Sequence, residues 1–170
     1  MSLSRTVAPL IGFALAVAGL ASPNAWADDW RAHAVTDHLR SNVGIGTTSV
    51  GEIEDGFGKL AAELTVSCVG NTTTVEVDTK IAYFRGYDVQ VEYALNGGSG
   101  QRALWNVCAG GNCAGLWDNS GIPFLKSLFG KSVLRVNLLR RAGATIVATF
   151  PIAGAKEAFG PLGKSCGWIP

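Results

Sequence analysis

The residues of this chain with the most distinctive chemistry are its four cysteines, Cys68, Cys108, Cys113 and Cys166. Thiolates either ligate a metal ion such as zinc or pair as disulfides, and four cysteines allow three disulfide connectivities. The spacing Cys-x4-Cys at Cys108 and Cys113 encloses two glycines, which makes a local bridge across a hairpin easy. A metal site there would lack neighbouring histidines. We therefore expect the disulfides Cys108–Cys113 and Cys68–Cys166, and no metal or cofactor.

Catalytic residue types are present, but their spacing indicates no catalytic site. His33 and His38 are five residues apart, which suits neither one face of a helix nor one face of a strand. The chain has no Gly-x-Ser-x-Gly nucleophile turn. Gly-Lys-Ser at 130–132 and 163–165 resembles the end of a phosphate-binding loop without its earlier glycine. No spacing singles out a carboxylate pair. We expect a protein that is not an enzyme.

Aromatic residues and arginine predict a binding surface in the middle of the chain. Tyr83, Arg85 and Tyr87 lie around a glycine turn, and Trp105 and Trp117 flank the short Cys108–Cys113 loop. These residue types are enriched at the energetic centres of protein–protein interfaces. For the two tryptophans the alternative is packing in the core. Tyr83, Arg85 and Tyr87 are the residues expected at the surface.

The first 27 residues have the pattern of a secretory signal peptide. An apolar run from Val7 to Ala21 follows a short start whose only charge is Arg5, and Ala25-Trp26-Ala27 is a cleavage pattern. The apolar run is shorter than the roughly 20 residues that span a bilayer. We expect cleavage after Ala27, a periplasmic or secreted location, and a single domain from 28 to 170.

Charge and hydropathy beyond the signal peptide exclude several partner classes. Without Arg5, basic and acidic residues balance at 13 each. The chain has no basic stripe or RNA-binding aromatic motif, so we expect no nucleic-acid partner. No second apolar run is long enough to span a membrane.

Alternating apolar and polar residues predict a mostly β domain. Strands are expected at 30–35, 62–78 (a hairpin), 80–84, 89–95, 101–107, 133–140 and 145–152. Helical spacing predicts helices at 122–129, capped by 118–120, and from 155 to 166 with a kink or break at Pro161. The segment 41–51 reads as a loop or edge strand, and 52–58 as an acidic turn. We expect an antiparallel β-sandwich or partly open barrel with two short helices in the C-terminal half.

The C-terminal block carries several short segments that together resemble a known family. They are residues 122–128, 134–136, 148–154, 158–162 and the final Cys-Gly-Trp at 166–168. The block is similar to the VasI-like family of small proteins associated with bacterial type VI secretion, and Cys68 takes the place of that family's upstream cysteine. The pair Cys108–Cys113 departs from this pattern and is similar to the invasion-associated locus B family, whose members are also small, exported and β-rich. The resemblance implies a setting and no reaction.

These observations predict a non-enzymatic, exported accessory protein that binds another envelope or secreted protein, with type VI secretion as the implied setting. The competing hypothesis is an inhibitor-type binder of a cell-wall enzyme such as lysozyme. A protruding Cys108–Cys113 loop would favour the inhibitor, and an exposed aromatic surface would favour the accessory protein.

Overall fold

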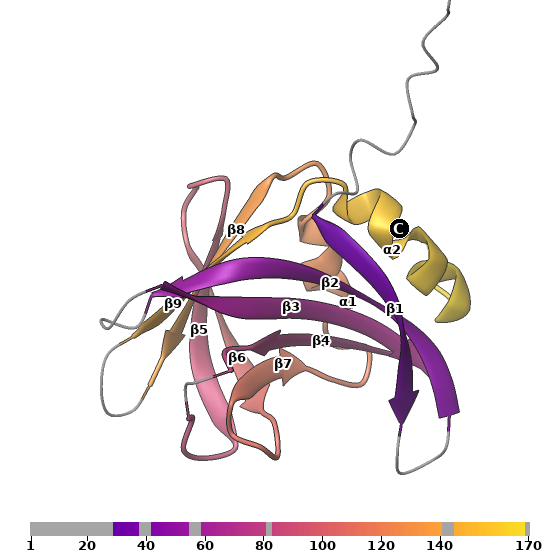
Figure 1. Ribbon diagram of the computed structural model, residues 1–170. Coiled ribbons are helices and arrows are strands. Elements are labelled where there is room, and N and C mark those ends of the chain that lie inside the picture. Colours follow the sequence, from indigo (N-terminus) through magenta and orange to yellow (C-terminus); the bar gives the residue numbers. More distant parts are fainter. Residues whose placement is uncertain (1–28, 38–41, 55–58, 81–82, 141–144, 169–170) are drawn as a thin grey trace, which may run out of the picture.

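The computed structural model describes residues 29–37, 42–54, 59–80, 83–140 and 145–168. Within these ranges the chain forms nine antiparallel strands and two α-helices (Figure 1). The predicted signal peptide and most of the predicted acidic turn, residues 55–58, lie outside the described residues.

The first four strands form a meander in which each strand pairs with the next. They are β1 (Trp30–Asp37), β2 (Asn42–Glu54), β3 (Lys59–Val69) and β4 (Thr72–Asp78). The β3–β4 hairpin confirms the prediction for 62–78. Its turn is Gly70-Asn71, and both residues adopt positive φ, which glycine and asparagine tolerate best.

The remaining strands and the helices follow in the order that the sequence predicts, with β7 as an additional strand. They are β5 (Asp88–Leu95), β6 (Gln101–Val107), β7 (Cys113–Leu116), α1 (Ile122–Ser127), β8 (Val133–Leu139), β9 (Ile146–Pro151) and α2 (Ala155–Ser165). The strand predicted at 80–84 is wrong for its described residues, because Lys80, Tyr83 and Phe84 belong to no strand. α2 is continuous through Pro161, so the expected break does not occur.

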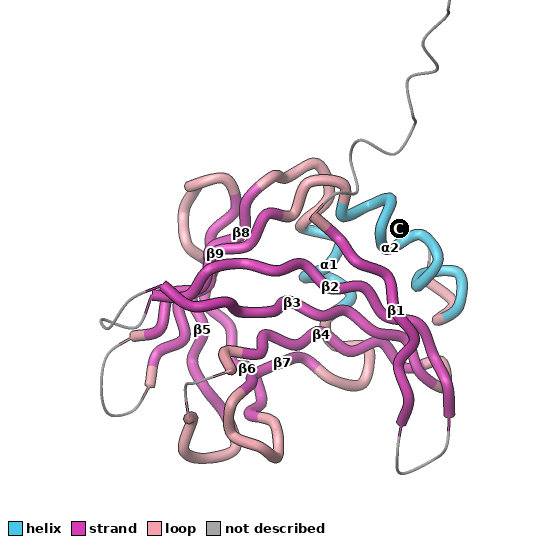
Figure 2. The backbone as a smooth tube through the Cα atoms, viewed as in Figure 1, coloured by secondary structure: helices cyan, strands magenta, loops and turns pink. Residues whose placement is uncertain are grey.

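The sheet closes on itself to form a barrel. The strand order runs β2-β3-β4-β7-β6-β5-β8-β9, and β9 pairs back to β2, while β1 lies outside this ring on β2. The closing ladder joins Glu52–Glu54 to Val147–Thr149. The prediction of a mostly β fold is therefore confirmed in its barrel form, here a closed eight-stranded antiparallel barrel, whereas the sandwich alternative is not shown. The tube in Figure 2 shows the strands curving round to meet.

β2 corrects the expectation of a loop or edge strand at 41–51. It is a 13-residue strand that pairs with β3 on one side and with β1 and then β9 on the other. Gly51 lies at the change of partner. A Cβ atom at Gly51 would collide with the carbonyl oxygen of Thr149 and would lie 2.6 Å from the ring of Phe150. The glycine that reads as a loop signal thus allows the backbones of β2 and β9 to approach.

Alternate residues of the strands fill the barrel and form its core. The fully buried side chains include Leu64, Val66, Val75, Val77, Trp105, Leu134, Val136, Leu138, Ile146 and Phe150. The intervening residues of β3, β4 and β8 are partly or fully exposed. The period of two that predicts these strands is therefore also the pattern of burial.

The two helices pack aromatic side chains against the strands. Phe124 of α1 makes edge contacts with Tyr93 and Trp105, at ring-centroid distances of 5.0 and 5.3 Å. Phe159 of α2 contacts the ring of Trp30 at 4.9 Å, and α2 lies beside β1 in Figure 1. The prediction that residues 118–120 cap α1 is wrong, because Gly121 occupies the N-cap position and no side chain caps this helix.

Both predicted disulfides are confirmed. Cys68 on β3 bonds to Cys166 directly after α2, and Cys108 bonds to Cys113 across the β6–β7 turn. The C-terminal segment is also held by a hydrogen bond of 2.8 Å from the indole nitrogen of Trp168 to the hydroxyl of Thr73. The end of the chain is thus fastened to the barrel at two adjacent strands.

Candidate functional site

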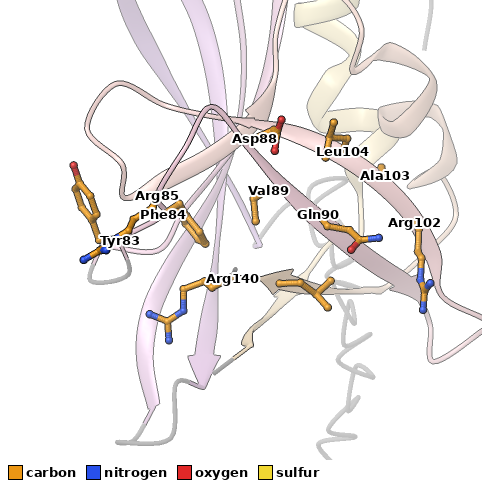
Figure 3. A pocket seen from close by; sticks show the side chains of 11 residues that line it. Tyr83, Phe84, Arg85, Asp88, Val89, Gln90, Arg102, Ala103, Leu104 and Arg140 are labelled. Carbon is orange, nitrogen blue, oxygen red and sulfur yellow. The ribbon is translucent and has the colours of Figure 1, made fainter. Parts of the chain in front are cut away.

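An open pocket with a volume of about 1030 Å³ lies where β5, β6 and the end of β8 meet the segment before β5 (Figure 3). We call it the arginine pocket. It is lined by Tyr83, Phe84, Arg85, Asp88, Val89, Gln90, Arg102, Ala103, Leu104, Leu139 and Arg140.

Strand register brings the middle of the arginine pocket together. Gln90 on β5 pairs with Leu104 on β6 and with Leu139 on β8, so the three residues lie side by side across three strands. Leu104 is 63% exposed, although it belongs to a strand whose inward residue, Trp105, is completely buried. The pocket therefore has an apolar patch on the outer face of the sheet.

The Cys108–Cys113 loop positions Tyr83 and Arg85. The backbone N–H of Phe84 donates to the carbonyl of Gly111 at 2.7 Å, and the N–H of Val107 donates to the carbonyl of Tyr87 at 2.9 Å. A Cβ atom at Gly111 would lie 2.6 Å from the ring of Tyr83, so the tyrosine packs where only glycine leaves room. One side of this ring is supported by the disulfide loop, and the residue remains 66% exposed.

Arginine dominates the charge of the pocket. Arg85, Arg102 and Arg140 are three of the five arginines in the described part of the chain, and no lysine lines the pocket. Asp88 is the only acidic lining residue among those described. Arg102 lies 3.9 Å from a carboxylate oxygen of Glu92, and both side chains are exposed. The pocket therefore concentrates positive charge on a chain that is almost neutral.

The five residues predicted for binding have different positions. Tyr83 and Arg85 are exposed and line the arginine pocket, whereas Tyr87 is 92% exposed but does not line it. Trp105 points into the barrel and is completely buried, so it belongs to the core, which was the alternative to a binding role. Trp117 is partly buried with its ring over Gly115, away from the pocket lining.

The sequence reasoning missed the strand residues of the arginine pocket. Arg102 and Leu104 line the same pocket as Arg85 only because β6 pairs with β5, the strand of Gln90. One signal was present in the sequence: Leu104 shares the face of Arg102, so an apolar side chain interrupts the polar face of β6.

The described residues contain no group of three or more histidine, cysteine, aspartate or glutamate side chains arranged to hold a metal ion. In the same part of the chain, no helix has the length and apolar character needed to cross a membrane.

Comparison of the chain with protein-family models, curated proteins and solved structures finds no match.

One carboxyl group outside the pocket has a marked electrostatic environment. Burial raises the pKa of Glu76 above its ordinary value of 4.5; the nearby Asp78 raises it further, while Lys80 opposes the shift. Glu76 is partly buried on β4 and pairs with Gly115, the residue that the Trp117 ring covers. The folded protein therefore binds a proton at Glu76 more tightly than the unfolded chain does.

We expect stability to fall as pH rises from 4.5 through the raised pKa of Glu76, because the unfolded chain releases this proton first. Glu76→Gln should remove that fall and raise the free energy of unfolding at neutral pH. Urea unfolding between about pH 4 and 7 measures both effects. Glu54→Gln, at an exposed position, controls for the loss of one carboxylate. An unchanged pH slope in Glu76→Gln would contradict this prediction.

Proposed function

We propose that this protein is an exported binding protein without catalytic activity, which holds another envelope protein through the arginine pocket. The observation that carries the proposal is the combination, in one open pocket, of exposed Tyr83 and Leu104 with Arg85 and Arg102. Tyrosine and arginine are the side chains that most often dominate the energy of protein interfaces.

The two disulfides support an oxidising, exported location, since disulfides form and persist in such compartments. The signal-peptide pattern of residues 1–27 points the same way. The resemblance of the C-terminal block to the VasI-like family suggests type VI secretion as the setting. That part of the proposal rests on the resemblance alone.

The geometry of the disulfide loop favours the arginine pocket over an inhibitor loop. The amide nitrogen of Asn112 donates to a carboxylate oxygen of Asp78 at 3.0 Å, and the backbone N–H of Thr79 donates to the carbonyl of Asn112 at 3.0 Å. These bonds hold the loop against the end of β4. An inhibitor that inserts a loop into an enzyme cleft needs that loop to project from its surface.

Site-specific photo-crosslinking in living cells tests the proposal. A photoreactive amino acid at Tyr83 or Leu104 should capture an envelope protein, and the same group at Leu60, which is 45% exposed on β3, should not. Tyr83→Ala/Arg85→Ala should weaken binding of the captured protein by about 30-fold, the effect of losing one strong interface residue.

Tyr87→Ala provides the matched variant, because Tyr87 is more exposed than Tyr83 but does not line the pocket. It should leave binding nearly unchanged. Equal capture from Tyr83 and Leu60 would count against the arginine pocket. Capture of a lysozyme or amidase through residues 109–112 would move the function to an enzyme inhibitor.

A further inference from the structure

We propose that the arginine pocket binds an extended acidic segment of the partner protein, in which carboxylates flank an apolar side chain. This inference rests on the proposed function, because it names the chemistry that the partner presents to the same pocket.

Charge is the first reason. Three arginines against Asp88 give the lining a net positive charge, and arginine binds carboxylates through two parallel hydrogen bonds, which lysine does not do. Among the described residues Arg85 forms no ion pair, and the exposed Arg102–Glu92 pair at 3.9 Å is long and therefore weak. The guanidinium groups of Arg85 and Arg102 are thus accessible to carboxylates of a partner.

The apolar patch is the second reason. Leu104 and Leu139 lie on either side of Gln90 in the lining of the pocket, and 63% of Leu104 is exposed to solvent. A simple inorganic anion would leave this surface in water. An apolar side chain between two carboxylates would cover Leu104 while the arginines bind the charges, which releases water from apolar surface.

The shape of the pocket is the third reason. Figure 3 shows Tyr83 and Arg85 on one side of the pocket and Arg102 on the other. Alternate side chains of an extended peptide share one face, so a carboxylate, an apolar side chain and a second carboxylate at positions i, i+2 and i+4 can all face the pocket as the segment crosses it. The pocket is open along its length, and Tyr83 and Leu104 on its lining are about two-thirds exposed, so a segment that lies across the surface can reach both.

Fluorescence anisotropy with the oxidised protein tests this inference. The probes are fluorescein-labelled peptides in which the number and order of Asp and Leu vary, with two matched sets that carry Asn for Asp or Ser for Leu. We expect only the Asp–Leu peptides to bind well, and binding to weaken as salt is raised.

Protein variants assign the binding to the pocket. Arg85→Gln/Arg102→Gln should weaken peptide binding by about tenfold or more, and Arg85→Lys/Arg102→Lys by less, because lysine keeps the charge but not the paired hydrogen bonds. Arg135→Gln is the control, since Arg135 is exposed on β8 and does not line the pocket. Circular dichroism should show each variant folded.

Four results would overturn the inference: no binding by any peptide of the set, equal binding of the Asn peptides, no effect of the double Gln variant, or complete displacement by inorganic phosphate. Tight binding of phosphatidylglycerol vesicles without peptide binding would assign the pocket to a lipid surface. If peptides fail while crosslinking from Tyr83 still captures a protein, the proposed function stands and only its acidic segment is wrong.

Discussion

Replacing Cys68 and Cys166 together by alanine is expected to lower the free energy of unfolding by about 4–5 kcal/mol, a large part of the roughly 5–15 kcal/mol that stabilises an ordinary domain. The bridge joins residues 98 positions apart, so it removes a large loop-closure entropy from the unfolded chain. Both sulfurs are buried between β3 and the end of α2, and their loss also releases the C-terminal segment.

The second bridge provides the matched control. Cys108→Ala/Cys113→Ala removes a bridge between residues only five positions apart. For this short loop the same entropy argument gives a loss of about 2 kcal/mol in the free energy of unfolding. Urea unfolding of both double variants measures the difference. Equal losses would contradict the entropic account, and a larger loss for the short loop would show that its role in holding the Tyr83 segment dominates.

Trp105→Ala is expected to lower the free energy of unfolding by about 3–5 kcal/mol, the usual range for an aromatic core residue. Its side chain is completely buried and meets Phe124 edge to face at 5.3 Å, so truncation leaves a cavity beneath α1. Trp105→Phe should cost much less. Among the described residues the indole nitrogen of Trp105 has no hydrogen-bond partner, so phenylalanine loses no polar contact.

Thermal and urea unfolding check this prediction, with Tyr87→Ala as the surface control. Tyr87 is 92% exposed, and its loss should change stability by less than about 0.5 kcal/mol. A Trp105→Ala protein of unchanged stability would show that Trp105 does not hold the core together. Loss of partner binding by Trp105→Phe at full stability would return Trp105 to the binding surface.

The sequence predicts the parts of this fold that depend on local pattern. The hairpin at 62–78 and the strand at 89–95 alternate without interruption, and the structure places their apolar faces inside the barrel. Both disulfides were predicted as well, because the short Cys108–Cys113 spacing leaves one partner for each remaining cysteine.

The closure of the barrel could not be predicted from local pattern. Residues 42–51 are rich in glycine, serine and threonine, a composition that usually indicates loops. In this fold small residues are required in β2, because Gly51 must let another backbone approach and Ser49 is buried. These small residues are required by a contact with a distant strand, so the reason for the composition is visible only once the register of β2 with β9 is known.

The candidate site also has a part that the sequence predicts and a part that only the strand pairing reveals. Tyr83 and Arg85 are close in sequence to a turn, so their exposure could be predicted from the chain alone. Arg102 and Leu104 join them through the pairing of β5 with β6. Trp105 was separated from this surface by a single position, because a strand turns each successive side chain to the opposite face.

The closing ladder between β2 and β9 also affects how the chain folds. The strands β1 to β4 pair with their neighbours in sequence, whereas the stretch Glu52–Glu54 must wait for the distant residues 147–149. During that interval this edge of the nascent sheet has no partner, and unpaired edges invite aggregation. Glu54 and the Glu52–Lys59 ion pair place charged side chains at this edge, a feature by which natural sheets discourage pairing with other chains until the barrel closes.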